Sequence, residues 1–225
     1  KIKEELYMRT EKEILEVFKK ELDSFETTGT KIRAFTQEIL QYMPDYFLEK
    51  ENGRENRIVV HTKSCMVIAN ELFSLECFRE KFTASERDCI RSALLLHDAM
   101  LYGAGPEHKK IHDHPEYIAT YLQSDKWDGI LPGYIRKEIA SMVAAHSGQW
   151  NKDADNLKLN KPQTECEIFV HMCTHLVSKD TCTVQLPVVV ESYRNLYEKN
   201  VFLTKELESI KKNESGKPKT DFTDP

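Results

Sequence analysis

Glycine and proline are scarce in this chain, and their positions limit what it can fold into. The 225 residues contain eight of each. They fall between stretches in which apolar residues recur at steps of three and four, not inside those stretches. That step places side chains on one face of a helix, whereas a strand repeats every two residues. Since glycine and proline interrupt helices, their placement predicts an all-α fold with short connecting loops.

The clearest single helix is predicted at 57–75. Its apolar positions recur at steps of three and four, so they should share one buried face. The residues of that face are Ile58, His61, Cys65, Ile68 and Leu72. A helix after Thr83 is marked by the capping-box sequence Thr83-Ala84-Ser85-Glu86 and should run to His97.

Other helices are expected within 1–23 and at about 31–42, 114–122, 134–146, 165–179 and 204–212. Residues 49–55 should form a polar loop, and 181–190 either a strand or a buried helix. We therefore expect an N-terminal helical extension packed on the core (1–50), a metal-binding domain (51–212) and a frayed tail (213–225). The charged N-terminal helix should either pack on the core or serve in dimerisation or partner docking.

Composition narrows the class of protein. A hydrophobic fraction of 40% with 31% charged residues is typical of a globular protein, and a net charge of −5 weighs against a broad nucleic-acid surface. A local site for a small phosphate-bearing ligand remains compatible with that charge. No stretch approaches the ~18 apolar residues of a membrane span, and 1–20 is too charged for a signal peptide. The six cysteines lack C-x-x-C spacing and are expected as buried free thiols in a cytoplasmic protein.

His97 and Asp98 are the residues most difficult to explain as ordinary core. They follow the apolar run Ala93-Leu94-Leu95-Leu96, where a helix should end. An adjacent imidazole and carboxylate buried there would be costly without a partner, and a divalent cation satisfies both at once. This ligand pair suits zinc, iron, manganese or nickel. The sequence therefore predicts one or two divalent transition-metal ions.

Three further histidines lie where they could join such a site. His61 is on the apolar stripe of its helix, His114 begins a helix, and His146 ends one. Each alone is more often a hydrogen-bonded core or helix-end residue. Together with His97 and Asp98 they match the way helix bundles build metal sites from facing helices. Two other histidines, His108 and His112, fall in a polar loop and should be exposed.

These residues resemble the HD-domain superfamily of metal-dependent phosphohydrolases. His61 on one helix and His97-Asp98 after an apolar run are similar to the family's defining pattern. Segments 114–119 and 143–150 resemble those that carry further histidine ligands, and 169–176 resembles the helix with a final aspartate. The resemblance covers about 57–179.

The resemblance implies a helical bundle with the metals at its middle. His61, His97 and Asp98 would hold one ion, and Asp98 would bridge to a second ion held by His114 and His146. The expected activity is hydrolysis of a nucleotide, cyclic nucleotide or related phosphoester, with Asp98, His114 and His146 as catalytic residues. A minority of two-iron members carry out oxygenase chemistry instead. Lys109 and Lys110, in the loop above the site, are expected either to meet phosphate or to be merely solvated.

Two positions depart from the family pattern. Thr174 stands where the final aspartate is expected, and Leu101 stands where many relatives carry a lysine that can meet phosphate. Neither side chain can replace the group it stands for. The alternative is therefore a catalytically weak or inactive relative that binds a nucleotide or a protein partner.

Overall fold

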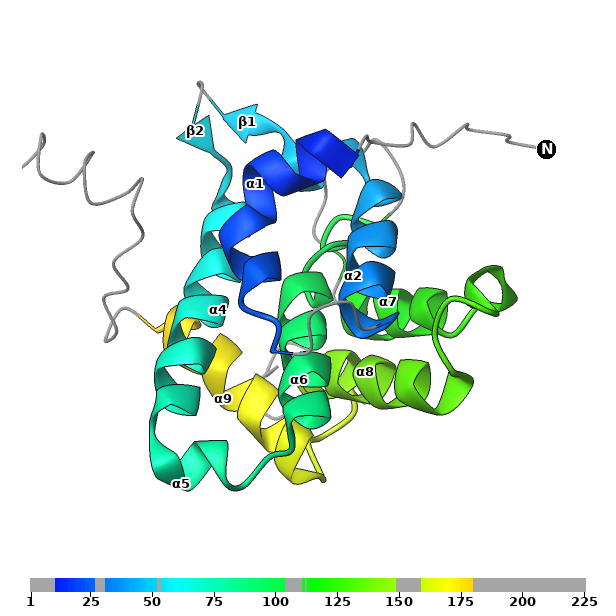
Figure 1. Ribbon diagram of the computed structural model, residues 1–225. Coiled ribbons are helices and arrows are strands. Elements are labelled where there is room, and N and C mark those ends of the chain that lie inside the picture. Colours follow the sequence, from blue (N-terminus) through cyan, green and yellow to red (C-terminus); the bar gives the residue numbers. More distant parts are fainter. Residues whose placement is uncertain are drawn as a thin grey trace, which may run out of the picture. The chain divides into compact units, whose positions relative to one another are not determined.

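The computed structural model describes residues 11–26, 31–51, 54–103, 111, 113–148 and 159–179. The part that it describes is all-α, as predicted, apart from one very short strand pair (Figure 1). The chain divides into one unit of residues 1–184 and another of residues 185–225, and every described residue belongs to the first. The predictions for 181–190, 204–212 and the tail, and those for His108, Lys109, Lys110 and His112, lie outside the described residues.

Seven of the described helices correspond to expected ones, and in six of them both ends lie within about two residues of the expected ends. The elements in chain order are α1 (Glu11–Asp23), α2 (Lys31–Gln41), α3 (Asp45–Leu48), β1 (Lys50–Glu51), β2 (Arg54–Glu55), α4 (Arg57–Ser74), α5 (Glu76–Arg79), α6 (Ala84–Leu96), α7 (His114–Leu122), the 3-10 turn η1 (Asp125–Trp127), α8 (Gly133–Ala145) and α9 (Glu165–Ser178).

The sequence prediction was wrong in two local respects. Residues 49–55 are not all loop, because β1 and β2 pair antiparallel with Lys50 opposite Glu55 and Glu51 opposite Arg54. The four-residue helices α3 and α5 were not predicted. A single turn is too short to show a helical repeat in the sequence.

Helix α6 lies at the centre of the bundle. It contacts α2, α4, α8 and α9 (Figure 1). Every residue from Arg87 to Leu96 is buried, because neighbouring helices cover it on several sides and no solvent-facing stripe remains. Its predicted capping box is present, with Thr83 and Glu86 bonded reciprocally at the first turn. The C-terminal end of α6 consequently places His97 and Asp98 in the interior.

The buried face of α4 differs from the predicted one. Ile58 and Cys65 are buried as expected, but Ile68 and Leu72 are only half-buried at the edge of the core. The buried residues of α4 are Ile58, Val59, Thr62, Ser64, Cys65, Met66, Ala69 and Phe73. The buried face of α4 is set by the helices it packs against, mainly α6 and α9.

The cysteines follow the prediction only in part. Cys65, Cys89, Cys166 and Cys173 are buried free thiols, whereas Cys77 on α5 is exposed. Cys182 lies outside the described residues. Cys77 sits on a short surface turn, so its thiol does not contribute to the core.

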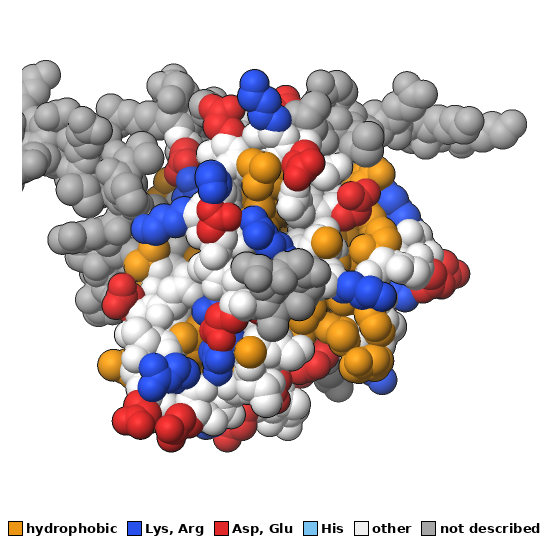
Figure 2. All heavy atoms as spheres, in the orientation of Figure 1, with side chains coloured by type: hydrophobic (Ala, Val, Ile, Leu, Met, Phe, Trp, Pro, Cys, Tyr) orange, Lys and Arg blue, Asp and Glu red, His pale blue; other side chains and the backbone are white. Residues whose placement is uncertain are grey.

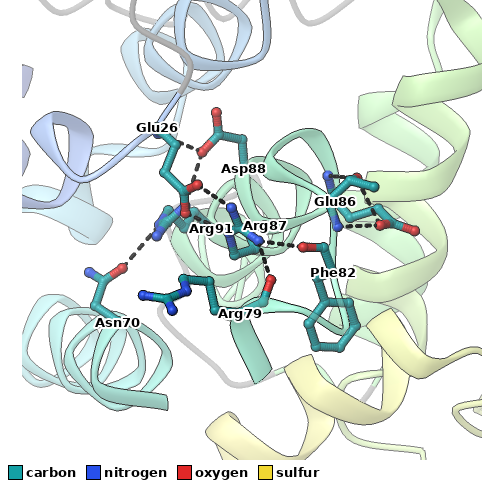
Figure 3. Close-up of polar contacts among 9 residues, drawn as sticks. Glu26, Asn70, Arg79, Phe82, Glu86, Arg87, Asp88 and Arg91 are labelled. Carbon is teal, nitrogen blue, oxygen red and sulfur yellow. Dashed lines mark hydrogen bonds and ion pairs between the residues drawn. The ribbon is translucent and has the colours of Figure 1, made fainter. Parts of the chain in front are cut away.

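A network of charged side chains attaches the segment after α1 to the central helix (Figure 3). Glu26 accepts from both Arg87 and Arg91, and the fully buried Asp88 accepts from Arg91 Nη1 at 3.0 Å and from the Glu26 backbone N–H at 2.9 Å. Arg87 also donates to the carbonyl of Arg79 at 2.6 Å. Because each buried charge is paired, the network holds the N-terminal segment against α6 without leaving an isolated ion in the interior.

Charges of both signs are interspersed over the face seen in Figure 2, with hydrophobic side chains in between. Within the described helices, none is long and apolar enough to cross a membrane. The chemically unusual residues are found inside the bundle, at the end of α6.

Candidate metal centre

Asp98 is surrounded by four imidazoles that come from four different helices of the bundle. His97 caps the C-terminal end of α6 next to it, His61 comes from α4, His114 is the first residue of α7, and His146 caps the end of α8. Rings of His61 and His97, of His97 and His146, and of His146 and His114 have centroids 5.2, 5.0 and 5.3 Å apart. The structure thus brings together all five residues that the sequence singled out as metal ligands.

The two carboxylate oxygens of Asp98 divide the histidines into pairs. Oδ2 lies 3.8 Å from His61 Nε2 and 3.5 Å from His97 Nε2. Oδ1 lies 3.0 Å from His114 Nε2 and 3.6 Å from His146 Nε2. We refer to these as the Oδ2 side (His61, His97) and the Oδ1 side (His114, His146). Each carboxylate oxygen of Asp98 therefore faces two imidazole nitrogens.

Local backbone contacts determine which nitrogen of three of these rings carries hydrogen. The Nδ1 atoms of His97, His114 and His146 lie 2.8, 2.9 and 2.7 Å from the carbonyl oxygens three residues earlier, those of Leu94, Ile111 and Val143. A carbonyl only accepts, so each Nδ1 must donate. In the neutral ring Nε2 then presents a lone pair toward Asp98, as metal-ligating histidines do.

This arrangement is unfavourable without a cation. Nε2 of the fully buried His97 has no hydrogen-bond partner within the described residues. Burial lowers the pKa of His97 to about 3, so its ring is neutral at pH 7. Burial alone would raise the pKa of Asp98, but the surrounding imidazoles hold it well below its ordinary value. The lone pair of His97 Nε2 therefore faces a carboxylate oxygen of Asp98 at 3.5 Å.

The spacing of the donor atoms agrees with metal coordination. With metal–ligand bonds of about 2.1 Å, adjacent ligand atoms are about 3.0 Å apart around an octahedral ion and about 3.4 Å apart around a tetrahedral one. The four nitrogen-to-oxygen distances at Asp98 run from 3.0 to 3.8 Å. The donor atoms are therefore already close to the separations that a shared cation would require.

The protein thus contains buried groups of His, Asp and Cys side chains that could hold a metal ion. One such group is His97, Asp98 and His146, and another is His61, Cys65 and His97; within each, the ligand atoms lie within 4.8 Å of one another. Searches of protein-family models, curated proteins and solved structures found no match to this chain. Its chemistry must therefore be inferred from the centre itself.

Cys65 is the residue at this centre that the sequence analysis did not treat as a ligand. Its Sγ lies 3.7 Å from His61 Nε2. The signal was present, because positions four apart lie on one side of a helix. Cys65 was assigned to the core because a free cysteine on an apolar stripe is usually a small buried hydrophobic residue.

Helix α9 supports the centre indirectly. The buried Thr174 hydroxyl lies 3.0 Å from the carbonyl of His171 and 3.3 Å from that of His146, so it donates to backbone. His171 Nδ1 also donates to the His146 carbonyl, at 2.6 Å. These contacts orient the end of α8, and with it the His146 ring. Glu167, also on α9, is engaged in the capping box at its first turn.

The chain after Asp98 is held by a tyrosine. The Tyr46 hydroxyl donates to the Gly103 carbonyl at 2.7 Å and accepts from the Tyr102 backbone N–H at 3.1 Å. Gly103 has a φ of 72°, a conformation that glycine adopts without strain. Leu101 packs partly buried against the core. Its side chain contributes to packing and offers no charge to a phosphate.

A third group of potential ligands, Glu86, Glu138 and Cys166, lies near the opposite end of α6. Glu86 accepts from the Thr83 backbone N–H and hydroxyl at 2.7 and 2.8 Å as part of the capping box. That role explains its position without a ligand. The candidate functional site is consequently the one around Asp98.

Proposed function

We propose that this protein is a metal-dependent phosphohydrolase of the HD-domain type, acting on a nucleotide, cyclic nucleotide or related phosphoester. The observation that carries the proposal is the position of Asp98 between two pairs of imidazoles, one pair on each carboxylate oxygen. The order of these residues along the chain is also that of the family pattern. A bridging carboxylate with two histidines on each side suits a pair of divalent ions.

The side chains present fit such a pair. The buried His97 Nε2 lacks a hydrogen-bond partner within the described part of the chain, which a cation would supply. His61 and His97 would hold one ion and His114 and His146 the other, each sharing Asp98. Mn, Fe, Ni and Zn are the divalent ions that this set of imidazole and carboxylate ligands favours.

Bound ions would lower the pKa of a coordinated water so that hydroxide forms near neutral pH, and would offset charge on the phosphate oxygens. The residues contribute positioning. Asp98, shared between the two ions, would orient the attacking water, and the proton of that water would leave to solvent. The backbone contacts of His114 and His146 keep their rings from rotating, which preserves the alignment needed for attack at phosphorus.

Thr174 and Leu101 favour a second candidate, a relative that binds a nucleotide or a protein partner with little or no turnover. The Thr174 hydroxyl donates to two backbone carbonyls and brings no negative charge. Leu101 packs against the core and cannot contact phosphate as a lysine would. The two candidates share the metal centre and differ in whether substrate is turned over.

Metal content and phosphate release test the proposal together. The purified chain would be analysed for bound metals and then assayed against a panel of nucleotides, cyclic nucleotides and a generic phosphodiester with added manganese, nickel or iron. We expect about two ions per chain and release that depends on them, with Asp98→Ala inactive as the matched control. Bound nucleotide without turnover would favour the second candidate. Absence of both bound metal and turnover under all conditions would reject the phosphohydrolase proposal.

A further inference from the structure

We propose that the Cys65 thiolate is a protein ligand on the Oδ2 side of the centre, forming with His61 and His97 a nitrogen-and-sulfur site for a thiophilic divalent cation such as zinc or iron. This inference rests on the metal centre of the proposed function. It adds a ligand that the family resemblance does not imply. The two sides of Asp98 would then bind ions by different chemistry.

The helix geometry places the thiol beside the imidazole. His61 and Cys65 are one turn apart on α4, so their side chains lie on the same side of that helix. Sγ is 3.7 Å from His61 Nε2. A tetrahedral ion with bonds of about 2.05 Å to nitrogen and about 2.3 Å to sulfur separates those two atoms by about 3.6 Å. Only a small adjustment would therefore be needed to bind an ion between them.

A second, independent observation comes from His97. His97 belongs to the same group of potential ligands, in which one ligand atom each of His61, Cys65 and His97 lies within 4.8 Å of the others. The Nε2 atom of His97 is buried and has no hydrogen-bond partner among the described residues. A cation held with Cys65 would satisfy this lone pair, which no side chain of the described bundle does.

Cys65 also supplies a charge that helix α9 does not. The Thr174 hydroxyl stands at the position expected for a final carboxylate, and it donates to the carbonyls of His146 and His171. A cation on the Oδ2 side would otherwise have only the shared Asp98 as an anionic ligand. A thiolate at Cys65, on α4, would add one negative charge. The number of anionic ligands would then equal that of a site with a final aspartate.

Ligation requires that the S–H bond break, with the proton released to solvent and a sulfur lone pair forming the bond to the cation. Burial raises the pKa of Cys65 well above its ordinary value, so the metal-free protein carries the thiol. The Oδ2 side would then be the softer site. The Oδ1 side, with imidazole and carboxylate alone, would accept manganese or nickel more readily.

Cobalt substitution distinguishes this proposal from the function it rests on. The metal-free full chain would be titrated with Co²⁺ while the absorption spectrum is recorded. A thiolate ligand produces an intense near-ultraviolet charge-transfer band, whereas imidazole and carboxylate give only weak visible bands. We expect the band to saturate at about one equivalent in the wild type and to be absent in Cys65→Ser.

The matched control is Cys173→Ser, because Cys173 is another fully buried thiol, on α9, outside the potential ligand groups found in the described residues. It should retain the band. Zinc affinity should fall by at least roughly 10-fold in Cys65→Ser and remain unchanged in Cys173→Ser. Circular dichroism would verify that each variant is folded.

Each outcome has one meaning. Cobalt bound at two equivalents with visible bands but no thiolate band overturns the proposed role of Cys65 and leaves the metal centre of the phosphohydrolase intact. Absence of any cobalt binding overturns both. Should Cys65→Ser fail to fold, ¹¹³Cd NMR of the wild type decides the matter. A strongly deshielded resonance indicates sulfur ligation, and a resonance in the nitrogen-and-oxygen range rejects it.

Discussion

The Nε2 atom of His114 lies 3.0 Å from Oδ1 of Asp98, across a separation of 16 residues in the chain. It is the shortest of the four imidazole contacts to that carboxylate, and it lies on the side opposite His61 and His97. Because α7 delivers His114 to one oxygen and α4 delivers His61 to the other, the two sides of Asp98 depend on different helices.

Because the histidines on the two sides of Asp98 come from different helices, we expect that single substitutions can remove one metal ion and leave the other. His114→Ala should lower the metal content from about two ions per chain to about one, because the Oδ2 side keeps all of its own ligands. His97→Ala should remove the other ion, and Asp98→Asn should weaken both. Elemental analysis after dialysis measures this. Loss of both ions in His114→Ala would show that the two sides are not independent.

Burial of His97 predicts that the metal-free protein loses stability in mild acid. The pKa of this ring is about 3 in the folded protein and about 6.5 in the unfolded chain. Between those values the unfolded chain binds a proton that the folded protein excludes. The free energy of unfolding should therefore fall as pH falls through this window, by about 1.4 kcal/mol per pH unit.

Urea denaturation at pH 7 and pH 5 measures this effect, and we expect a loss of about 2 kcal/mol from His97. His97→Gln should flatten the dependence. Burial also lowers the pKa of His171, so His171 adds to the pH dependence of the free energy of unfolding. Its contribution should remain in His97→Gln. The lowered pKa of Asp98 affects the free energy of unfolding only in stronger acid. An equal slope in the wild type and in His97→Gln would contradict the prediction.

Thr174 allows the position of the expected final carboxylate to be tested. Thr174→Asp places a negative charge next to the carbonyl oxygens of His146 and His171, where the hydroxyl now donates. The metal-free variant should lose stability as a result. If this position faces the Oδ2 side, the longer acidic side chain should turn toward a bound ion, and metal affinity should rise.

The matched control is Thr174→Val, which removes the hydroxyl and keeps the shape. It should cost about 1 kcal/mol of stability with no gain in metal affinity. Isothermal titration calorimetry and thermal denaturation provide the two measurements. An unchanged metal affinity in Thr174→Asp would contradict the expectation, made from the sequence, that Thr174 stands where a final aspartate ligand would be.

The charged network of Figure 3 predicts a large effect on stability without an effect at the metal centre. Asp88→Ala removes the acceptor that binds the buried Arg91 and the Glu26 backbone N–H. It should lower the free energy of unfolding by about 3 kcal/mol, with metal content per folded chain unchanged. Lys81→Ala, which breaks the exposed pair with Glu165, should cost at most about 1 kcal/mol. Comparable losses in the two variants would refute this view of the network.

Part of the centre could be predicted without coordinates, because it depends on residues close in the chain. His97 and Asp98 are adjacent at the end of an apolar run, and the helix that carries them is marked by its own capping box. His114 and His146 could be placed at helix ends from the prolines and apolar spacing near them. Local patterns of this kind determine where helices begin and end, whatever the rest of the chain does.

Tertiary packing decided the remainder. Cys65 has the pattern of an ordinary apolar residue on α4. The helix itself places its thiol beside His61, but only the packing of α4 against α6 and α9 brings it near His97. Likewise, the engagement of the Thr174 hydroxyl by the end of α8 depends on how α8 and α9 cross. The sequence by itself determined the longer helices, their order and the residues that share a face of each. Which faces meet depends on packing between distant segments, and a repeat of 3.6 residues within one helix carries no information about its neighbour.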